Sequence, residues 1–165
     1  MTAATDIAPP SRLLRVALEG EALTRLSPIL EADRAQAVAD LEAENGFVLT
    51  GARAEPGPYS LHLSIQEGRL VFDIRRPDEA QIGAILLALG PFRGLIKDYQ
   101  LLVESHAKAV EEGREARIQA IDMGRRALHN EGAELMQQRL DGKIAIDFAT
   151  ARRLFTLVCV LHQRI

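Results

Sequence analysis

The stretch that decides the fold is Tyr59-Ser-Leu-His-Leu-Ser-Ile-Gln-Glu-Gly-Arg-Leu-Val-Phe-Asp-Ile-Arg75. Apolar and polar residues alternate on both sides of the central Gln-Glu-Gly-Arg, which is the pattern of two half-buried strands. The two apolar faces match only if Leu63 lies opposite Phe72, because a shift of one residue would turn one strand over. The sequence therefore predicts a β-hairpin in this register, which also places His62 opposite Asp73 on the other face.

Strands are expected before this hairpin, and helices after it. On the N-terminal side, a helix from Ser27-Pro28 to Asn45-Gly46 separates two predicted strands, at residues 13–18 and 47–50. After Asp78 the chain is predicted to be helical, at residues 79–89, 91–110, 114–140 and 148–163. This order predicts an α+β fold in which a small, mainly antiparallel sheet of about four strands packs against a C-terminal helical bundle. We expect a disordered N-terminal arm at residues 1–10 and a single α+β domain at residues 11–165.

Composition limits the function classes. The chain has 165 residues and a net charge of −3, so a nucleic-acid partner is unlikely. The charge is uneven, because residues 1–113 hold 11 basic and 17 acidic residues (net −6), whereas residues 114–165 hold 9 and 6 (net +3). That asymmetry could steer a small anionic ligand or an acidic protein partner towards the C-terminal third, although a solvated helical surface is the favoured explanation.

The cellular location follows from three expected absences. The single cysteine, Cys159, excludes an internal disulfide and fits a reducing cytosol. The first ten residues have no basic and apolar segments typical of a signal peptide, and no apolar run approaches the length of about 20 residues that a membrane helix needs. The sequence therefore predicts a cytoplasmic protein without a membrane segment. A homo-oligomer remains an open alternative.

The most informative polar cluster lies in Ile121-Asp-Met-Gly-Arg-Arg-Ala-Leu-His-Asn-Glu-Gly132. At about 100° per residue, Arg125 falls in the centre of the apolar stripe of its own helix, with Asp122 and His129 along one edge. A charge at that position must be paired or must bind something, because an unpaired buried charge costs several kcal/mol. If the charge is paired within the protein, we expect Asp98 of the preceding helix to be its partner. Gly132, in the same stripe, predicts the close approach of another backbone.

This cluster has two interpretations. In the functional one, Arg125 and Arg126 bind an anion and His129 carries a proton, with Asp122 orienting it. In the structural one, Arg125 is a buried cation held by Asp122 and an acidic residue of a neighbouring helix. Arg152 and Arg153 would add a basic rim near the start of the last helix.

A secondary candidate site is the pair His62 and Asp73, in which the carboxylate could orient the imidazole. Polar decoration of an exposed sheet face is the simpler interpretation. Cys159 and His162 have the spacing of half a metal site, but they share an apolar face and no second cysteine or histidine lies at ligand spacing. We expect no metal and no cofactor, since the chain also lacks a P-loop, a dinucleotide fingerprint, an HExxH motif and a GxSxG motif.

Several motifs are similar to those of a known family. They include Leu70-Val-Phe-Asp-Ile-Arg75, Ile121-Asp-Met-Gly-Arg-Arg126, Leu128-His-Asn-Glu-Gly132 and Thr150-Ala-Arg-Arg-Leu-Phe-Thr-Leu-Val-Cys-Val-Leu-His162. On these stretches the chain resembles the alphaproteobacterial uncharacterised protein family 0262 over most of residues 12–163. The resemblance implies a cytosolic bacterial protein, and it carries over no activity, cofactor or functional residue.

Three hypotheses follow. The leading one is a small binding or regulatory module that engages a protein partner or a small anionic ligand. The alternative is a metal-independent enzyme that acts on a small phosphorylated or carboxylated substrate through the Arg/His/Asp cluster. A weak RNA-associated factor is the third.

Overall fold

The computed structural model describes residues 11–20 and 26–162, and the predicted arm at residues 1–10 lies outside that range. The fold is α+β, as predicted, and the described residues form a mixed four-stranded sheet and four α-helices. None of the helices in the described part is long and apolar enough to cross a membrane. The elements are β1 (Leu13–Glu19), α2 (Pro28–Ala43), β2 (Phe47–Leu49), η2 (Gly51–Arg53), β3 (Tyr59–Gln66), β4 (Arg69–Arg75), β5 (Gln81–Ala88), η3 (Gly90–Phe92), α3 (Arg93–Glu111), α4 (Glu115–Leu140), β6 (Ile144–Ile146) and α5 (Phe148–Leu161).

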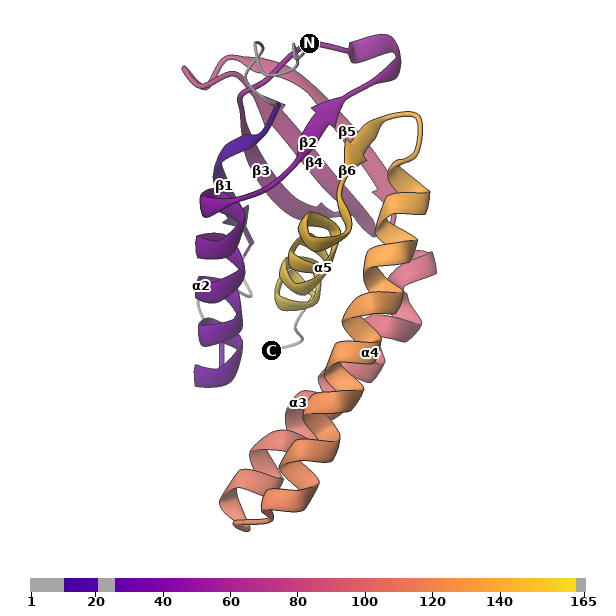
Figure 1. Ribbon diagram of the computed structural model, residues 1–165. Coiled ribbons are helices and arrows are strands. Elements are labelled where there is room, and N and C mark those ends of the chain that lie inside the picture. Colours follow the sequence, from indigo (N-terminus) through magenta and orange to yellow (C-terminus); the bar gives the residue numbers. More distant parts are fainter. Residues whose placement is uncertain (1–10, 21–25, 163–165) are drawn as a thin grey trace, which may run out of the picture.

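The sheet has the strand order β1-β3-β4-β5 (Figure 1). Its centre is the predicted hairpin, and the register is confirmed, with Leu63 opposite Phe72 and His62 opposite Asp73. β5 pairs antiparallel with β4, whereas β1 pairs parallel with β3, because the chain crosses over through α2 and β2 between them. The sheet is therefore mainly antiparallel, as the sequence predicts.

Two strand assignments differ from the prediction. Residues 79–89 were expected to be helical, but residues 81–88 form β5, the fourth strand of the main sheet. The predicted strand at 47–50 exists as β2, yet it pairs with β6 in a separate two-stranded ladder, with Phe47 opposite Ile146. β5 therefore takes the place in the main sheet that was expected for the strand at residues 47–50.

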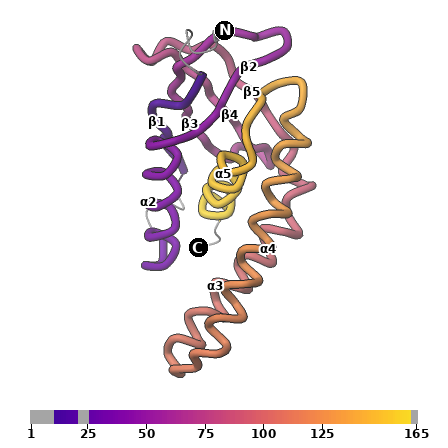
Figure 2. Tube along the Cα trace, in the orientation of Figure 1, coloured from indigo at the N-terminus to yellow at the C-terminus, as the bar shows by residue number. Residues whose placement is uncertain are grey.

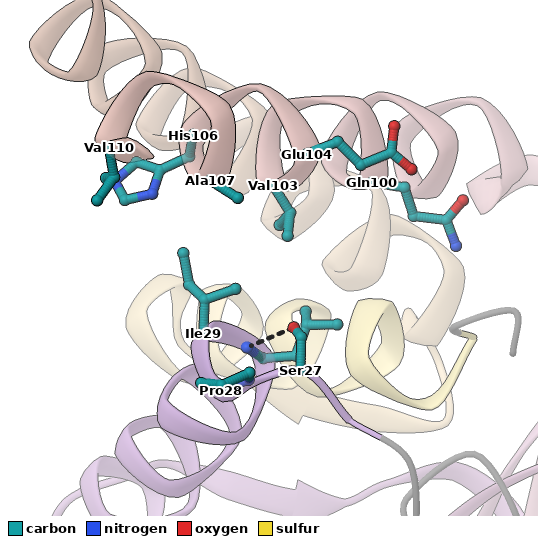
Figure 3. Close-up of a pocket in the computed structure, with 10 residues that line it drawn as sticks. Ser27, Pro28, Ile29, Gln100, Val103, Glu104, His106, Ala107 and Val110 are labelled. Carbon is teal, nitrogen blue, oxygen red and sulfur yellow. Dashed lines mark hydrogen bonds between the residues drawn. The ribbon is translucent and has the colours of Figure 1, made fainter. Parts of the chain in front are cut away.

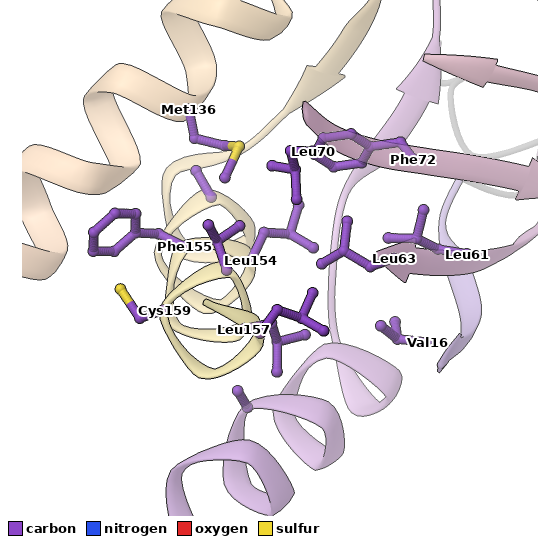
Figure 4. Close-up of a cluster of buried hydrophobic side chains, with 14 of the residues drawn as sticks. Val16, Leu61, Leu63, Leu70, Phe72, Met136, Leu154, Phe155, Leu157 and Cys159 are labelled. Carbon is purple, nitrogen blue, oxygen red and sulfur yellow. The ribbon is translucent and has the colours of Figure 1, made fainter. Parts of the chain in front are cut away.

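The helices gather on one side of the sheet, with α5 lying between α2 and α4 (Figure 1). Asp147 caps α5 by accepting a hydrogen bond from the Thr150 backbone at 2.7 Å. Ten of the fourteen residues of α5 are buried, because sheet and helices surround it. Figure 4 shows Leu154 and Leu157 of α5 facing Leu63 of β3, with Phe155 and Cys159 on the side away from the sheet. α5 is therefore the centre of the core.

Helices α3 and α4 form a long antiparallel pair that projects beyond the core (Figures 1 and 2). The inner half of α4 packs on α5 at Gly132, where an added Cβ would lie 2.4 Å from ring atoms of Phe155. The close approach predicted for Gly132 thus involves an aromatic ring and not another backbone. This packing places the middle of α4, including Arg125 and His129, beside both α5 and α2.

Candidate functional site

Arg125 is a paired and largely enclosed cation. Its Nη2 atom lies 2.8 Å from Oδ2 of Asp33 on α2, and both side chains are 18% exposed. Its Nη1 atom lies 3.7 Å from Oδ1 of Asp122, one helical turn earlier. The prediction of Asp98 as the partner is wrong, because α2 rather than α3 presents the carboxylate, and Asp98 is exposed. The expectation that Arg125 is paired is confirmed.

Asp33 joins three helices. Besides Arg125 of α4, it accepts a hydrogen bond from the hydroxyl of Tyr99 on α3, whose side chain is fully buried. Burial, together with the charge of Asp33, raises the pKa of Tyr99 far above its ordinary value, so the phenol stays protonated and donates to Asp33. Asp33 is therefore held by two donors from two different helices.

His129 lies one turn further along α4, between two rings. The centroid of its imidazole is 5.7 Å from that of Tyr99 and 6.3 Å from that of Phe155. Its Nε2 atom lies 3.4 Å from the hydroxyl oxygen of Thr156 on α5. Burial, and then the positive charges of Arg125 and Arg152, lower the pKa of His129 to about 4. The imidazole is consequently neutral at physiological pH.

A polar hollow of about 240 Å³ opens beside this cluster, between α2, α4 and α5. We call it the arginine cleft. Besides Ala37, it is lined by the charged and polar residues Asp33, Gln36, Asp40, Arg125, His129, Arg152, Arg153 and Thr156.

The three arginines of the cleft differ in their partners. Arg125 has two carboxylates, and Arg153 donates to the Glu44 carbonyl oxygen at 3.2 Å and lies 4.0 Å from Asp40. Within the described residues, no hydrogen bond or ion pair engages the guanidinium of Arg152, and its Nε atom is buried. The Nε atom of Arg125 is likewise buried and without a partner there. The cleft thus holds arginine donors that the described chain leaves unused.

The structure brings together four of the residues selected from the sequence, namely Arg125, His129, Arg152 and Arg153. Two others do not line the cleft. Asp122 lies at its edge, where it pairs with Arg125 and lies 3.9 Å from Nε2 of His106, and Arg126 is exposed on another side of α4.

The acceptors Asp33 and Asp40 and the hydroxyl of Thr156 were missed. Asp33 and Asp40 lie on α2, about 90 residues from α4, and no spacing rule reports such a contact. Thr156 carries the one hydroxyl in an otherwise apolar segment, Leu154-Phe-Thr-Leu157, and that polar interruption was the only sequence feature that could have marked it as a site residue.

The secondary pair, His62 and Asp73, lies on the face of the sheet away from α5. They are opposite in register, but the imidazole contacts two other carboxylates, with Nε2 2.7 Å from Glu79 and Nδ1 3.3 Å from Glu19. Burial opposes the ionisation of Asp73, but hydrogen bonds from Arg75 and Gln81 outweigh it and lower the pKa of Asp73. The two side chains therefore belong to one polar network, in which other residues connect them and no hydrogen bond joins them directly.

A larger hollow lies elsewhere, between the start of α2 and the outer part of α3 (Figure 3). It measures about 760 Å³ and is lined mainly by apolar groups such as Ile29, Val103 and Val110, with His106 and Glu104 at its margin. Figure 3 shows the Ser27 side chain bonded to the Leu30 backbone, as a helix cap. None of the residues selected as site candidates lines this groove.

Two further points concern metals. Among the described residues, no group of three or more His, Cys, Asp or Glu side chains is arranged to hold a metal ion. Cys159 is fully buried, and burial followed by the nearby charge of Asp33 raises the pKa of its thiol. Cys159 is therefore a core residue, in keeping with the expected packing role.

Comparisons with known proteins agree on one group. Residues 10–164 match the model of a family described as "Uncharacterised protein family (UPF0262)". The chain is 72% identical over 164 residues to a UPF0262 protein of Granulibacter bethesdensis, covering 96% of this chain and 93% of that protein. It is 60% identical over 153 residues to one of Acidiphilium cryptum and 47% identical over 154 residues to one of Bradyrhizobium diazoefficiens, each covering 93% of both chains. No solved structure matches significantly.

Proposed function

Since the chain belongs to the uncharacterised protein family UPF0262, whose name states no activity, we propose its function from the arginine cleft. The protein is a small binding module, and the cleft binds an anionic group, a carboxylate or a phosphate, of a small ligand. The observation that carries this proposal is Arg152, a cation inside a cleft for which the described chain supplies no counter-ion.

The charge balance of the cleft favours an anion. Three arginines face the carboxylates of Asp33 and Asp40, and His129 is neutral at pH 7, so the lining carries one net positive charge. Asp33 is already occupied by Arg125 and Tyr99. A ligand anion would neutralise the remaining charge at Arg152, which is costly to leave uncompensated in a partly enclosed site.

The donor geometry fits the same ligand class. A guanidinium presents its N–H groups as a planar fork that matches two oxygens of a carboxylate or phosphate. The Thr156 hydroxyl beside it already donates to the backbone carbonyl oxygen of Arg152 at 3.1 Å, so the guanidinium itself supplies the donors that the anion would meet. A volume of about 240 Å³ suits a small metabolite or one acidic side chain of a protein partner.

The test uses inorganic phosphate and succinate as probes, titrated by calorimetry at constant ionic strength. We expect Arg152→Ala to weaken binding of the preferred anion at least about tenfold, because a charge-assisted bond is lost. Arg126→Ala is the matched control, since Arg126 is exposed and outside the cleft. Equal weakening by both variants would show general charge attraction and would contradict a built site.

A second readout identifies the cleft directly. Arg152 is one cause of the lowered pKa of His129, so Arg152→Ala should raise that pKa, as should a bound anion in the wild type. Imidazole proton shifts followed by NMR against pH report both changes. An anion that binds without moving the His129 titration binds somewhere else.

The enzyme alternative lacks a supporting observation. A proton carrier near neutral pH needs a pKa near the working pH, whereas that of His129 is about 4. Asp122, expected to orient the imidazole, contacts Arg125 and His106 instead. The geometry supports binding better than proton transfer.

A further inference from the structure

The two edges of the main sheet are treated differently. The edge at β1 is closed by the end of α2, because the Asn45 side chain accepts from the Leu13 N–H at 2.7 Å and donates to its carbonyl oxygen at 2.9 Å. Glu42 accepts from the Val16 N–H at 3.0 Å. These side chains occupy backbone groups that a further strand would use, so β1 is protected from pairing.

In the part of the chain that the structure describes, the edge at β5 has no side-chain hydrogen bonds of this kind, although Arg53 lies against Gly83 and a hollow of about 330 Å³ at Ala84 and Leu86 is also lined by Lys143. Within the described residues, β5 has a strand neighbour, β4, on one side only. Apart from the ladder with β4, no backbone hydrogen bond there ends on residues 82–88. The strand sequence, Gln81-Ile-Gly-Ala-Ile-Leu-Leu-Ala88, contains no charged residue and no proline, the usual devices against edge pairing. Leu86 is 47% exposed on the outer face of this strand.

We propose that β5 pairs antiparallel with β5 of a second copy of this chain, which joins two four-stranded sheets into one. The outer face of the strand carries Ile82, Ala84 and Leu86 in alternation. A two-fold axis at Ala84 places the small residue opposite itself and sets Ile82 of each copy opposite Leu86 of the other. The stripe is therefore complementary to its own inverted copy, and pairing covers the exposed leucine.

The charges at the two ends of β5 also complement each other. Asp78 is exposed just before the strand begins, and the exposed Arg69 of β4 lies opposite Ala88 at its end. Antiparallel pairing brings the acidic end of one copy beside the basic end of the other, twice in each dimer.

Cysteine cross-linking tests the register, and native Cys159 is buried and does not interfere. Opposed residues of antiparallel strands have Cα atoms about 4.5–5.5 Å apart, which permits a disulfide. Ala84→Cys should therefore form a covalent dimer on mild oxidation. Ile82→Cys and Leu86→Cys should each form no covalent dimer alone and should form one when the two variants are mixed. Cross-linking of Leu86→Cys to itself with none by Ala84→Cys would overturn the register and the proposal.

The assembly is tested by light scattering on gel filtration, at protein concentrations up to about 0.1 mM. We expect a dimer for the wild type and a monomer for Leu86→Lys, which places a charge opposite Ile82 of the second copy. Leu14→Lys is the matched control, because Leu14 is a leucine of similar exposure, 48%, on the protected edge strand. A monomeric wild type, or a dimer that Leu86→Lys leaves intact, would overturn the proposal and assign the edge to another occupant.

Discussion

Replacing Arg125 by alanine tests whether the central ion pair holds the three helices together. The variant leaves Asp33 with Tyr99 as its remaining donor and removes the Nη2–Oδ2 contact of 2.8 Å. Breaking a fully buried pair costs about 3–5 kcal/mol. Because both side chains are 18% exposed and water can reach the cleft, we expect a loss of about 2–3 kcal/mol in the free energy of unfolding.

The assay is urea unfolding followed by circular dichroism, supported by thermal melting, where this loss corresponds to about 5–10 °C for a chain of this size. Arg126→Ala, an exposed neighbour on the same helix, should change stability by less than about 0.5 kcal/mol. In a double-mutant cycle, Asp33→Asn should cost much less in the Arg125→Ala background than in the wild type. An Arg125→Ala protein that melts like the wild type would refute the reasoning.

Two further predictions concern α4. Gly132→Ala should lower the free energy of unfolding in urea by about 2–3 kcal/mol, because the new methyl group meets the Phe155 ring at 2.4 Å. Gly124→Ala is the control and should stabilise the protein slightly, because the nearest neighbour of its new methyl group is a Leu102 side chain at 3.6 Å. The pKa of His129 in the folded protein, about 4, lies below the ordinary value of 6.5. The unfolded chain therefore binds the proton more readily, and the free energy of unfolding falls as the pH drops from about 6.5 to 4. His129→Gln should remove about 2–3 kcal/mol of that fall, measured as the difference between two urea series, and parallel curves for the two proteins would contradict it.

Local patterns predicted the hairpin of β3 and β4 residue by residue, because strict alternation allows one register. The same kind of evidence failed at β5. Its run of Ile82, Ile85, Leu86 and Leu87 fits both a helical stripe and a strand buried on one face, and periodicity cannot decide between them. The β-branched isoleucines and Gly83 were the available signals for a strand, but the following helices outweighed them in the prediction.

For the site, sequence spacing identified Arg125 as a buried charge but could not name its partner. Positions on one helix report neighbours three and four residues away, which is how Asp122 was found. Helix α5 packs between α2 and α4, and Asp33 of α2 contacts Arg125 of α4 in the cleft that these helices leave between them. That arrangement is a property of the packed core, so tertiary contacts of this kind lie beyond what a single sequence determines.

The projecting pair of α3 and α4 divides α4 into two mechanically different halves. Ala109 of α3 and Ile121 in the outer half of α4 are buried, but neither belongs to the main hydrophobic cluster that includes Leu128, Met136 and α5. The tip can therefore open locally without disturbing the core, and its amide hydrogens should exchange with solvent faster than those of α5. Arg125 lies where the supported half begins, so an anion bound in the cleft would slow exchange up to that point and leave the tip as fast as before.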